Sequence, residues 1–574
     1  MIIVGINAYH ADASAAIFVN GQMLAAIEEE RFVRIKHRAG FPEQAILFCL
    51  KEAGIGFEQV DYFAIGRDPR AKLWKKLGYL LRHPHGSMDA IKERWQNRSQ
   101  VSSLQDMLAQ ISGLPAAHFI PKIKHVEHHR SHLASAFFAS PFDEAACLSI
   151  DGSGDFSTTM MAVGRHNTID VLNSIDFPHS IGIFYSAFTQ LLGFPHYGDE
   201  YKVMGMAPYG QPKYVQQLQE LIQCKPDGSF ALNLQYFKKG TSGIISYDKN
   251  FVPRVAPLYN ENMLAKFGPV RAKEEALSNH HLDLAASVQK ITEHTIFHLL
   301  NHLQQKTGLE KVCIAGGVAQ NSVANGKITR NTKFKEVYIP SAGHDAGISM
   351  GAALWVQHMQ CQLKRQPIFS AYTGSHYSNS EIKALLTGQQ IPFMEMEDEA
   401  LFEHVCQCLE NGGVVGWMSG RAEFGPRALG GRSILADPRR ADAKEILNLK
   451  IKRRESFRPF APSILKEYVK DFFETDEPVP FMEKVFTIKA EKRPLIPAVT
   501  HVDGSGRLQT VDKAISKRYY ALIDCFRKKT GIPILLNTSF NENEPIVNTP
   551  QEALNCYLRT QMDMLVMENI IVQR

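Results

Sequence analysis

A chain of 574 residues is too long for one hydrophobic core, because cores stop growing at roughly 250–300 residues, so two or three domains are expected. Its 44% hydrophobic and 21% charged residues exclude a mainly disordered protein. The net charge of +5 is too small to indicate a nucleic-acid-binding protein, which needs a concentrated basic face.

The N-terminal sequence MIIVGINAYH has no basic region before its apolar stretch, and no apolar run approaches the ~20 residues that span a bilayer. We therefore expect a cytoplasmic protein with no membrane partner. None of the nine cysteines forms the C-x2-C spacing of a zinc site, so Cys406 and Cys408 are expected to be free thiols.

The first thirty residues predict three strands, MIIVGINAY, SAAIFVNG and QMLAAIEEE, with an Asn-Gly turn that favours a hairpin. A small polar loop, residues 10–14, separates the first two. The later segment AACLSIDGSGDFSTTMMAVG repeats this strand-loop-strand pattern, with residues 151–155 in its loop. Two hairpins of one design predict an internal duplication. Between them, residues 72–83 (KLWKKLGYLLRH) form a basic amphipathic helix candidate, for which a solvated helix is favoured over a membrane or partner contact.

His128 and His132 are four residues apart, so one helix face would present both imidazoles, which can share a metal. Such a pair is often incidental. Asp151 and Asp345 lie in predicted turns and would add two carboxylates. Two imidazoles and two carboxylates suit Fe, Mn or Zn better than Mg, and the residues alone leave the metal open.

Two further segments carry glycines in predicted turns. KVCIAGGVAQNSVANGKI follows a buried-looking strand with Gly316 and Gly317, and Gly347 opens the small-residue stretch ISMGAALWVQ, which permits close helix approach. Backbone N–H groups at such loops and at helix N-termini can hold phosphates. The pattern suits a nucleotide cleft between two duplicated α/β halves.

The periodicity weakens after Gln360, which predicts a first domain over 1–362, a linker over 363–377 and a second α/β domain over 378–574. The clearest buried strands of the second domain are GGVVGWM and GIPILLNTSF.

Basic residues concentrate in the second domain. From Arg421 to Arg458, eleven Lys and Arg stand against five Asp and Glu. A solvated helix face or a salt-bridge network around a loop is the ordinary interpretation. Repeated Arg in a Gly/Pro-rich context instead favours a pocket for phosphate or carboxylate. Arg507 and the strand end at residues 537–539 would extend this set of donors.

Ten motifs, in family order and spanning nearly the whole chain, resemble those of the antibiotic- and nodulation-type O-carbamoyltransferases, the group of the tobramycin, cephamycin and Nod-factor carbamoyl transfer enzymes. The motifs are GINAYHADASAA, EEERFVRIKH, HHRSHLASAF, DGSGD, DEYKVMGMAPYG, AGGVAQNSVANG, HDAGISMGAAL, GRAEFGPRALGGRS, KIKRRESFRPFAP and LLNTSFN. Together they are highly specific, whereas any one alone would be weak.

The resemblance implies a duplicated actin-like (ASKHA, Kae1-like) ATPase domain followed by a YrdC-like α/β domain. It implies an ATP-dependent O-carbamoyltransferase that converts carbamoyl phosphate and ATP to a carbamoyl adenylate, with carbamate passing internally, and then carbamoylates a hydroxyl of a small molecule. A role in antibiotic or other natural product biosynthesis follows. Sugar, aminoglycoside, polyketide and β-lactam acceptors stay open, and a homodimer is the default oligomer.

The family's functional residues can be carried onto this sequence. The implied metal ligands are His128, His132, Asp151 and Asp345, with iron as the expected metal and Mg²⁺ or Mn²⁺ as alternatives. His10 is implied as a general base or a residue that positions phosphate, and Lys452 and Arg507 as further catalytic residues. The implied ATP contacts are Lys36, Gly152, Ser153, Gly154, Lys202, Gly316, Gly317 and Asn321. The implied carbamoyl phosphate pocket contains Arg427, Lys452, Arg507, Asn537 and Ser539.

Other functions stay open. Both implied domain types occur in tRNA threonylcarbamoyladenosine synthesis, although the modest net charge disfavours a polyanionic substrate. Hydrogenase-maturation carbamoyltransferases would need C-x2-C motifs, which are absent. An actin-like ATP-binding chaperone or sensor without group transfer would leave the Arg-rich second domain unexplained.

Overall fold

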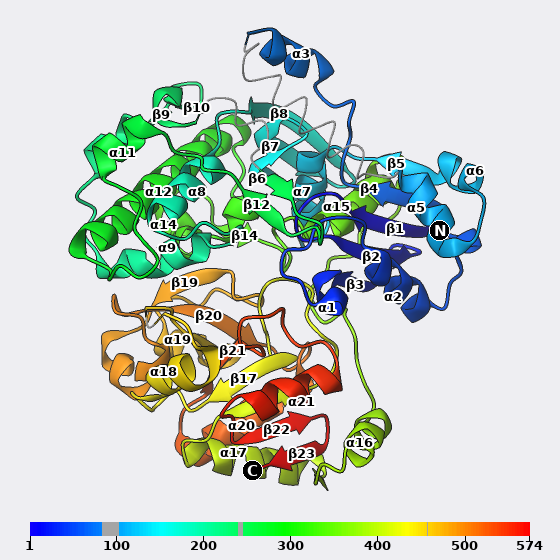
Figure 1. Ribbon diagram of the computed structural model, residues 1–574, viewed down its shortest axis with the longest axis vertical. Coiled ribbons are helices and arrows are strands. Elements are labelled where there is room, and N and C mark those ends of the chain that lie inside the picture. The colour runs from blue at the N-terminus through cyan, green and yellow to red at the C-terminus, as the bar shows by residue number, and fades with distance from the viewer. Residues whose placement is uncertain (83–102, 239–244, 456) are drawn as a thin grey trace. The chain divides into compact units, whose positions relative to one another are not determined.

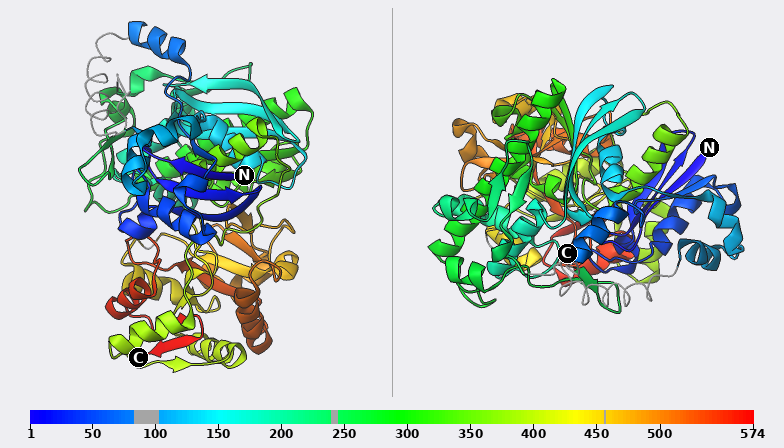
Figure 2. Two further views of the ribbon diagram at one scale, coloured as in Figure 1. Left: turned by 90° about the vertical axis from the view of Figure 1, so that its right-hand side faces the viewer. Right: turned by 90° about the horizontal axis from the view of Figure 1, so that it is seen from above.

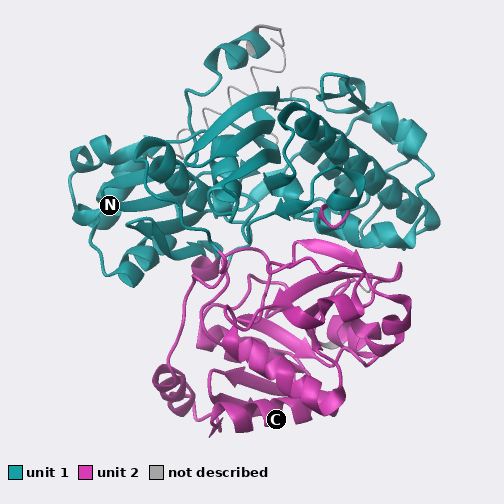
Figure 3. Cartoon of the chain, turned by 180° about the vertical axis from the view of Figure 1, so that it is seen from behind, with its two compact units in different colours: residues 1–30, 35–324, 328–368 teal, residues 31–34, 325–327, 369–574 magenta. Residues whose placement is uncertain are grey.

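The computed structural model describes residues 1–82, 103–238, 245–455 and 457–574 (Figure 1). The chain forms two compact units (Figure 3). Unit 1 comprises residues 1–30, 35–324 and 328–368, and unit 2 comprises residues 31–34, 325–327 and 369–574. The main division, between Ile368 and Phe369, falls inside the segment that the sequence marks as a linker.

Unit 1 contains two five-stranded sheets of the same topology. Sheet 1 has the order β3-β2-β1-β4-β5 and sheet 2 the order β8-β7-β6-β13-β14. In each, an antiparallel three-stranded meander is extended by two parallel strands, which confirms the predicted duplication. Figure 2 shows the two sheets side by side in the view from above. The strands are β1 (Ile2–Asn7), β2 (Ser14–Val19), β3 (Gln22–Glu28), β4 (Tyr62–Ile65), β5 (Ile123–His125), β6 (Glu144–Gly154), β7 (Ser157–Arg165), β8 (Thr168–Asp176), β13 (Lys311–Ala315) and β14 (Glu336–Tyr338).

Each half of unit 1 sends a helix across to the sheet of the other. Helix α7 (His128–Phe137), which follows sheet 1 in the chain, packs on β6 and β13 of sheet 2. Helix α15 (Gly347–Trp355), which follows sheet 2, packs on β1 and β2 of sheet 1 and against α7. The helices approach closely because α15 is rich in small residues, as predicted: a Cβ on Gly351 would lie 1.9 Å from the carbonyl oxygen of Ser131.

The remaining elements of unit 1 cover the outer faces of the sheets. Helix α2 (Glu43–Ala53) packs on β2 and β3, and α8 (Ile181–Leu191) and α12 (Asn279–Thr307) pack on β6. The predicted amphipathic helix is α3 (Leu73–Arg82), and residue 83 lies outside the described residues. The other helices and strands are α5 (Leu104–Ser112), α6 (Ala116–Phe119), α9 (Glu200–Met206), α10 (Val215–Gln219), β9 (Ile222–Cys224), β10 (Phe230–Leu232), β11 (Ile245–Tyr247), β12 (Pro253–Val255), α11 (Glu261–Phe267) and α14 (Ile328–Asn331); α1 (Glu30–Val33) and α13 (Ser322–Asn325) run from unit 1 into the short segments of unit 2.

Unit 2 is built on a nine-stranded mixed sheet of order β15-β23-β22-β16-β17-β21-β18-β20-β19. The two strands predicted with most clarity are β16 and β21. The β16–β22 and β18–β20 pairs are parallel and the other pairs are antiparallel. Trp417 on β16 is fully buried in the core, where α17 and α20 pack together. The elements are α16 (Asn379–Gly388), β15 (Met394–Glu395), α17 (Asp398–Glu410), β16 (Val415–Met418), β17 (Arg432–Ala436), α18 (Ala443–Ile446), β18 (Ala461–Leu465), α19 (Val469–Phe472), β19 (Lys484–Thr487), β20 (Ser505–Val511), α20 (Lys517–Thr530), β21 (Ile534–Ser539), α21 (Pro550–Arg559), β22 (Met564–Met567) and β23 (Ile570–Gln573).

Two sequence expectations can be compared directly with these elements. Cys406 and Cys408 are free thiols, as predicted. Within the described part of the chain, every helix is too short or too polar to span a bilayer.

Candidate functional site

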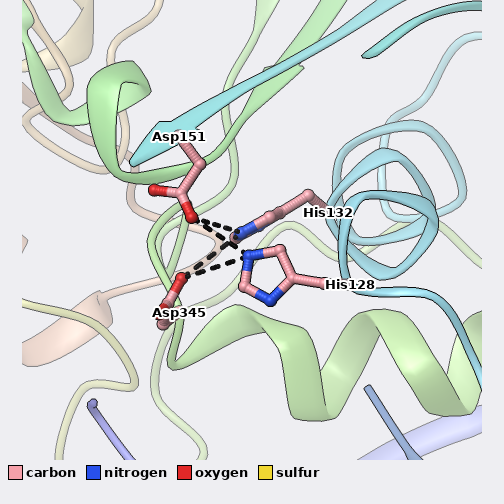
Figure 4. Close-up of side chains that lie close together, drawn as sticks. All are labelled: His128, His132, Asp151 and Asp345. Atoms are coloured by element: carbon pink, nitrogen blue, oxygen red, sulfur yellow. Dashed lines mark hydrogen bonds and ion pairs between the residues drawn. The ribbon is translucent and has the colours of Figure 1, made fainter. Parts of the chain in front are cut away.

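Four side chains from both halves of unit 1 converge on one point (Figure 4). His128 and His132 extend from one face of α7, Asp151 stands in β6, and Asp345 precedes α15. The Nε2 atom of His128 lies 3.0 Å from Oδ2 of Asp151 and 3.8 Å from Oδ1 of Asp345, and Nε2 of His132 lies 3.8 and 3.4 Å from the same two oxygens. The structure thus brings together all four residues that the sequence proposed as ligands.

The convergent atoms fit a metal ion. Both histidines are fully buried, and Asp151 and Asp345 are only 9% and 8% exposed. Nε2 of His132 and Oδ1 of Asp345 are buried without a hydrogen-bond partner, although a buried unsatisfied polar atom costs about 1–3 kcal/mol. A divalent cation among these atoms would satisfy both and neutralise the two carboxylates.

The ionisation of the cluster also favours positive charge at its centre. Burial raises the pKa of Asp345, and the neighbouring Asp151 carboxylate raises it further. Burial opposes ionisation of Asp151, yet His128 and His132 hold its pKa well below the usual range. Burial lowers the pKa of His132, but the two carboxylates raise it to about 9. Without an ion the cluster therefore retains protons that a divalent cation would replace.

Glycines allow the backbone to approach the cluster. The N–H of Gly317 donates to Oδ1 of Asp151 at 2.9 Å. Gly316 adopts a φ of 104°, and a Cβ there would lie 2.0 Å from the carbonyl oxygen of Ile150. A Cβ on Gly154 would lie 2.1 Å from the His128 ring. Only glycine fits at these last two positions, so the predicted glycine loops directly support the candidate ligands.

Gly152 and Ser153 extend from the same end of β6. Gly152 is partly exposed and Ser153 is exposed. Gly182, at the start of α8, lies against Gly152: a Cβ there would be 2.8 Å from Cα of Gly152. The N-terminal end of α8 therefore closely adjoins this predicted phosphate loop.

His10 lies beside the cluster, in the β1–β2 turn of sheet 1. Its ring centroid is 5.1 Å from that of His128. Burial lowers the pKa of His10 well below its usual range, and the adjacent His128 lowers it further. The imidazole is therefore neutral near pH 7 and can accept a proton.

The same turn contains an ion pair that sequence reasoning missed. Nδ1 of His37 donates to Oδ1 of Asp12 at 2.7 Å, and Nε2 of His344 lies 4.0 Å from the other Asp12 oxygen. Although burial lowers the pKa of His37, the Asp12 carboxylate raises it to about 9. Asp12 follows β1 in sheet 1, and Asp151 lies at the end of the buried part of β6, the corresponding strand of sheet 2. The internal duplication could therefore have identified Asp12 from the sequence.

Two of the implied ATP contacts, Asn321 and Lys202, already bond to neighbouring side chains. Asn321 and Gln289 exchange two hydrogen bonds of 3.0 Å, and Oδ1 of Asn321 also accepts from the N–H of Ala324. Lys202 pairs with Asp199 at 2.7 Å. Lys36 is exposed. Asn321 therefore organises its loop in addition to any contact with a ligand.

In unit 2 the ammonium of Lys452 is buried among oxygens. It donates to the carbonyl oxygen of Ser539 at 2.5 Å, and to Oδ1 and the carbonyl oxygen of Asn541 at 2.6 and 2.8 Å. Lys452 is 1% exposed. It therefore fixes the end of β21 and places a positive charge directly behind Ser539.

Asn537 and Glu423 organise the glycine-rich loop of unit 2. The side-chain N–H groups of Asn537 donate to the carbonyl oxygen of Ala428 at 3.0 Å, and its Oδ1 is buried without a partner. Oε1 of Glu423 accepts the backbone N–H groups of Leu429 and Gly431 at 2.6 and 2.7 Å. Glu423 was not identified from the sequence, because nothing local distinguishes it from the other four acidic residues of the basic stretch from Arg421 to Arg458.

Three guanidinium groups gather at β20. Nε of Arg507 is buried without a hydrogen-bond partner. Burial holds the pKa of Arg507 well below its usual range, and the like charges of Arg427 and Arg454 lower it further. In contrast, the fully buried Arg432 donates to the carbonyl oxygens of Gly420, Gly431 and Ser375 and supports the loop. The basic stretch therefore contains both a structural arginine and a cluster that an anion would stabilise.

Comparisons with known proteins agree with this arrangement. The family model described as carbamoyltransferase N-terminus matches residues 2–354, and the model described as carbamoyltransferase C-terminus matches residues 406–574. An uncharacterised protein, sll1178 of Synechocystis, is 43% identical over all of this chain and 96% of its own length. Nodulation protein NolNO of Sinorhizobium fredii is 36% identical over 99% of this chain and 80% of its own length. Among solved structures, T. kodakarensis HypF has 14% identity and a TM-score of 0.31 over 63% of this chain and 48% of that chain, a likeness too weak to define a shared fold. On the two family models and these relatives, the chain belongs to the carbamoyltransferase family.

Proposed function

We propose that this carbamoyltransferase is an ATP-dependent O-carbamoyltransferase that makes a carbamoyl adenylate and transfers its carbamoyl group to a hydroxyl of a small-molecule acceptor. The observation that carries the proposal is the buried His128, His132, Asp151 and Asp345 cluster, in which Asp151 also accepts the N–H of the Gly317 loop. Side chains that bind a cation, adjacent to backbone that can bind phosphate, suit a nucleotide triphosphate.

We assign the two steps to the two units. The duplicated topology of unit 1 supports an actin-like, Kae1-like ATPase domain over about residues 1–362, as the family resemblance implies. The arginine cluster of unit 2 supports a YrdC-like domain over about residues 378–574 that takes carbamoyl phosphate.

In unit 2, water cleaves carbamoyl phosphate to carbamate and inorganic phosphate. Arg507, with Arg427 and Arg454, neutralises the phosphate of the donor. Ser539 contributes a hydroxyl, and Lys452 stabilises the negative charge from behind it. Asn537 holds the loop that carries Arg427 through its bond to Ala428.

In unit 1, a carbamate oxygen attacks the α-phosphorus of ATP and pyrophosphate leaves. Activation is required because the anionic oxygen of carbamate donates into its carbonyl group and makes carbamate a poor electrophile. A divalent cation held by the four ligands, with iron as the expected metal, would offset charge on the triphosphate. Backbone N–H groups of residues 152–154 orient the phosphates, with Lys36, Lys202 and Asn321 as further contacts. Gly316 and Gly317, whose N–H groups donate to Gly343 and Asp151, let the backbone pass close to the cluster without a side chain in the way.

The acceptor hydroxyl then attacks the carbamoyl carbon, AMP leaves, and the hydroxyl proton passes to His10. Burial and the adjacent His128 lower the pKa of His10, so the imidazole is unprotonated when the acceptor binds, as this role requires. AMP and the O-carbamoylated acceptor are the products.

The test is pyrophosphate release and ATP–pyrophosphate exchange by the iron-loaded protein. Exchange should require carbamoyl phosphate and should be lost in Arg507→Ala. The control Arg440→Ala, whose guanidinium pairs with Asp442 at the surface, should exchange normally. Exchange that does not depend on carbamoyl phosphate, or no pyrophosphate release at all, would overturn the proposal and favour a nucleotide sensor.

A further inference from the structure

Helix α3 of unit 1 presents a cluster of apolar side chains to solvent. Leu73, Trp74 and Leu77 are 54%, 86% and 48% exposed. Positions i, i+1 and i+4 lie on one side of a helix, so the three side chains form one patch. Single exposed apolar residues are ordinary on protein surfaces, but an almost fully exposed tryptophan next to two exposed leucines is not. Figure 1 shows α3 at the outer margin of unit 1, beyond β8.

The other side of α3 is anchored to unit 1. The ring of Tyr79 makes edge-to-face contacts with Phe156 and Phe177, at centroid distances of 5.8 and 5.6 Å. Lys75 pairs with Asp176 at 2.7 Å, and Lys72 pairs with the same carboxylate. The helix is therefore held by one face while the leucine and tryptophan side chains lie on the other.

Charge around the patch is strongly positive. Residues 67–82 contain six Arg and Lys but only one acidic residue, Asp68, a net charge of +5 that equals the net charge of the entire chain. Helix α3 itself contains no acidic residue. Asp176 offsets only part of this excess.

We propose that α3 docks reversibly on an anionic lipid surface, with Trp74, Leu73 and Leu77 entering the boundary between head groups and acyl chains. Tryptophan favours this boundary because its ring is apolar and its N–H can stay hydrated. Lysine and arginine side chains beside the patch would contact lipid phosphates. A nucleic acid would satisfy the basic residues but not the apolar ones. The proposal replaces the expectation from the sequence that α3 is only a solvated helix without a membrane partner.

The experiment uses the full chain and vesicles of phosphatidylcholine with or without phosphatidylglycerol. Among the described tryptophans, Trp355 and Trp417 are 8% and 0% exposed. In a Trp95→Phe background, which removes the fourth tryptophan of the chain, a blue shift of emission on vesicle addition therefore reports mainly on Trp74. We expect the blue shift and co-sedimentation with phosphatidylglycerol vesicles and much less with phosphatidylcholine alone. Trp74→Ser should reduce co-sedimentation about tenfold. Arg70→Gln with Lys76→Gln should reduce co-sedimentation at low salt, and the difference from the wild type should shrink as salt is raised, because salt screens the charges that these variants remove.

The matched control is Leu172→Ser, which removes a 50% exposed leucine from β8 and should bind vesicles like the wild type. Equal thermal unfolding of all variants would show that folding is intact. The proposal is overturned if the wild type ignores anionic vesicles, if Trp74→Ser binds them equally well, or if sedimentation reveals a dimer that Trp74→Ser abolishes without any vesicle binding. Vesicle binding needs no substrate, so these outcomes are independent of the proposed reaction.

Discussion

The candidate sites of the two units concentrate opposite charge. In unit 1, Asp151 and Asp345 meet two imidazoles, and these carboxylates raise the pKa of His132 to about 9 against the effect of burial. In unit 2, Arg427, Arg454 and Arg507 gather, and burial together with the two like charges lowers the pKa of Arg507. The pKa shifts therefore favour a cation as the ligand of the unit 1 site and an anion as the ligand of the unit 2 site.

The largest effect is expected from the one residue of unit 1 that we assign to proton transfer. His10→Ala should lower acceptor carbamoylation by about 10²–10⁴-fold, because a general base contributes about that much. Carbamoyl phosphate-dependent ATP–pyrophosphate exchange should continue, since no proton leaves the acceptor in that step. Near-normal acceptor turnover in the variant would remove His10 from the mechanism.

Metal affinity tests the acidic side of the comparison. His132→Ala or Asp345→Asn should weaken metal binding by at least about 100-fold, because even residues that only support metal ligands contribute about 10–100-fold. Metal content measured by elemental analysis after dialysis checks this. The exposed His125, which lies in unit 1 outside the cluster, provides the control His125→Ala and should keep its metal. Full metal content in the ligand variants would contradict the assignment.

In the basic site of unit 2, Arg507 and Lys452 are expected to differ in their effect on stability. Arg507→Ala should lose use of carbamoyl phosphate while keeping the free energy of unfolding, because it relieves repulsion among like charges. Lys452→Ala should lose the same activity and also about 1–3 kcal/mol of stability, because oxygens of Ser539 and Asn541 lose their donor.

Steady-state kinetics and urea unfolding measure the two properties. Both variants should still convert preformed carbamoyl adenylate. Equal loss with both donors would contradict the division of the reaction between the two units.

The smallest effect concerns the Asp12–His37 pair. The pKa of His37 in the folded protein is about 9, above its unfolded value, so its stabilising contribution is fully present below about pH 6.5 and is lost as pH rises through 9. Because His37 is 35% exposed, solvent screening limits this contribution to about 1 kcal/mol. The difference in unfolding free energy between wild type and His37→Gln should shrink between pH 6 and pH 10, and a constant difference would show that the pair contributes no linkage.

Sequence reasoning worked where the signal is local. The two hairpins, the strands β16 and β21 and the shared face of His128 and His132 follow from periodicity and spacing. Reasoning failed where distant segments meet. The crossing of α7 and α15 to opposite sheets, and the membership of residues 31–34 and 325–327 in unit 2, depend on long-range packing that leaves no local pattern.

The polar residues show the same difference between local signals, which can be predicted, and contacts between distant segments, which cannot. Glycine-rich loops were visible in the sequence, and the structure has Gly317 on Asp151. The role of Glu423 as acceptor for the backbone N–H groups of Leu429 and Gly431 could not be predicted. Which side chain accepts these N–H groups depends on how the loop folds, and the sequence pattern does not show this. Lys452 was a candidate from the sequence, but its enclosure by Ser539 and Asn541 depends on contacts between segments far apart in the chain.

The helix crossing has a consequence for how unit 1 assembles. The half that ends with α7 supplies both candidate nitrogen ligands, and the half that begins with β6 supplies both candidate oxygen ligands. Neither half expressed alone would contain all four candidate ligands. Each would also expose the face of its sheet that is covered in the intact unit by the helix of the other half. With the metal bound as we propose, ion binding is coupled to the association of the two halves, so chelation should loosen their interface before either sheet unfolds.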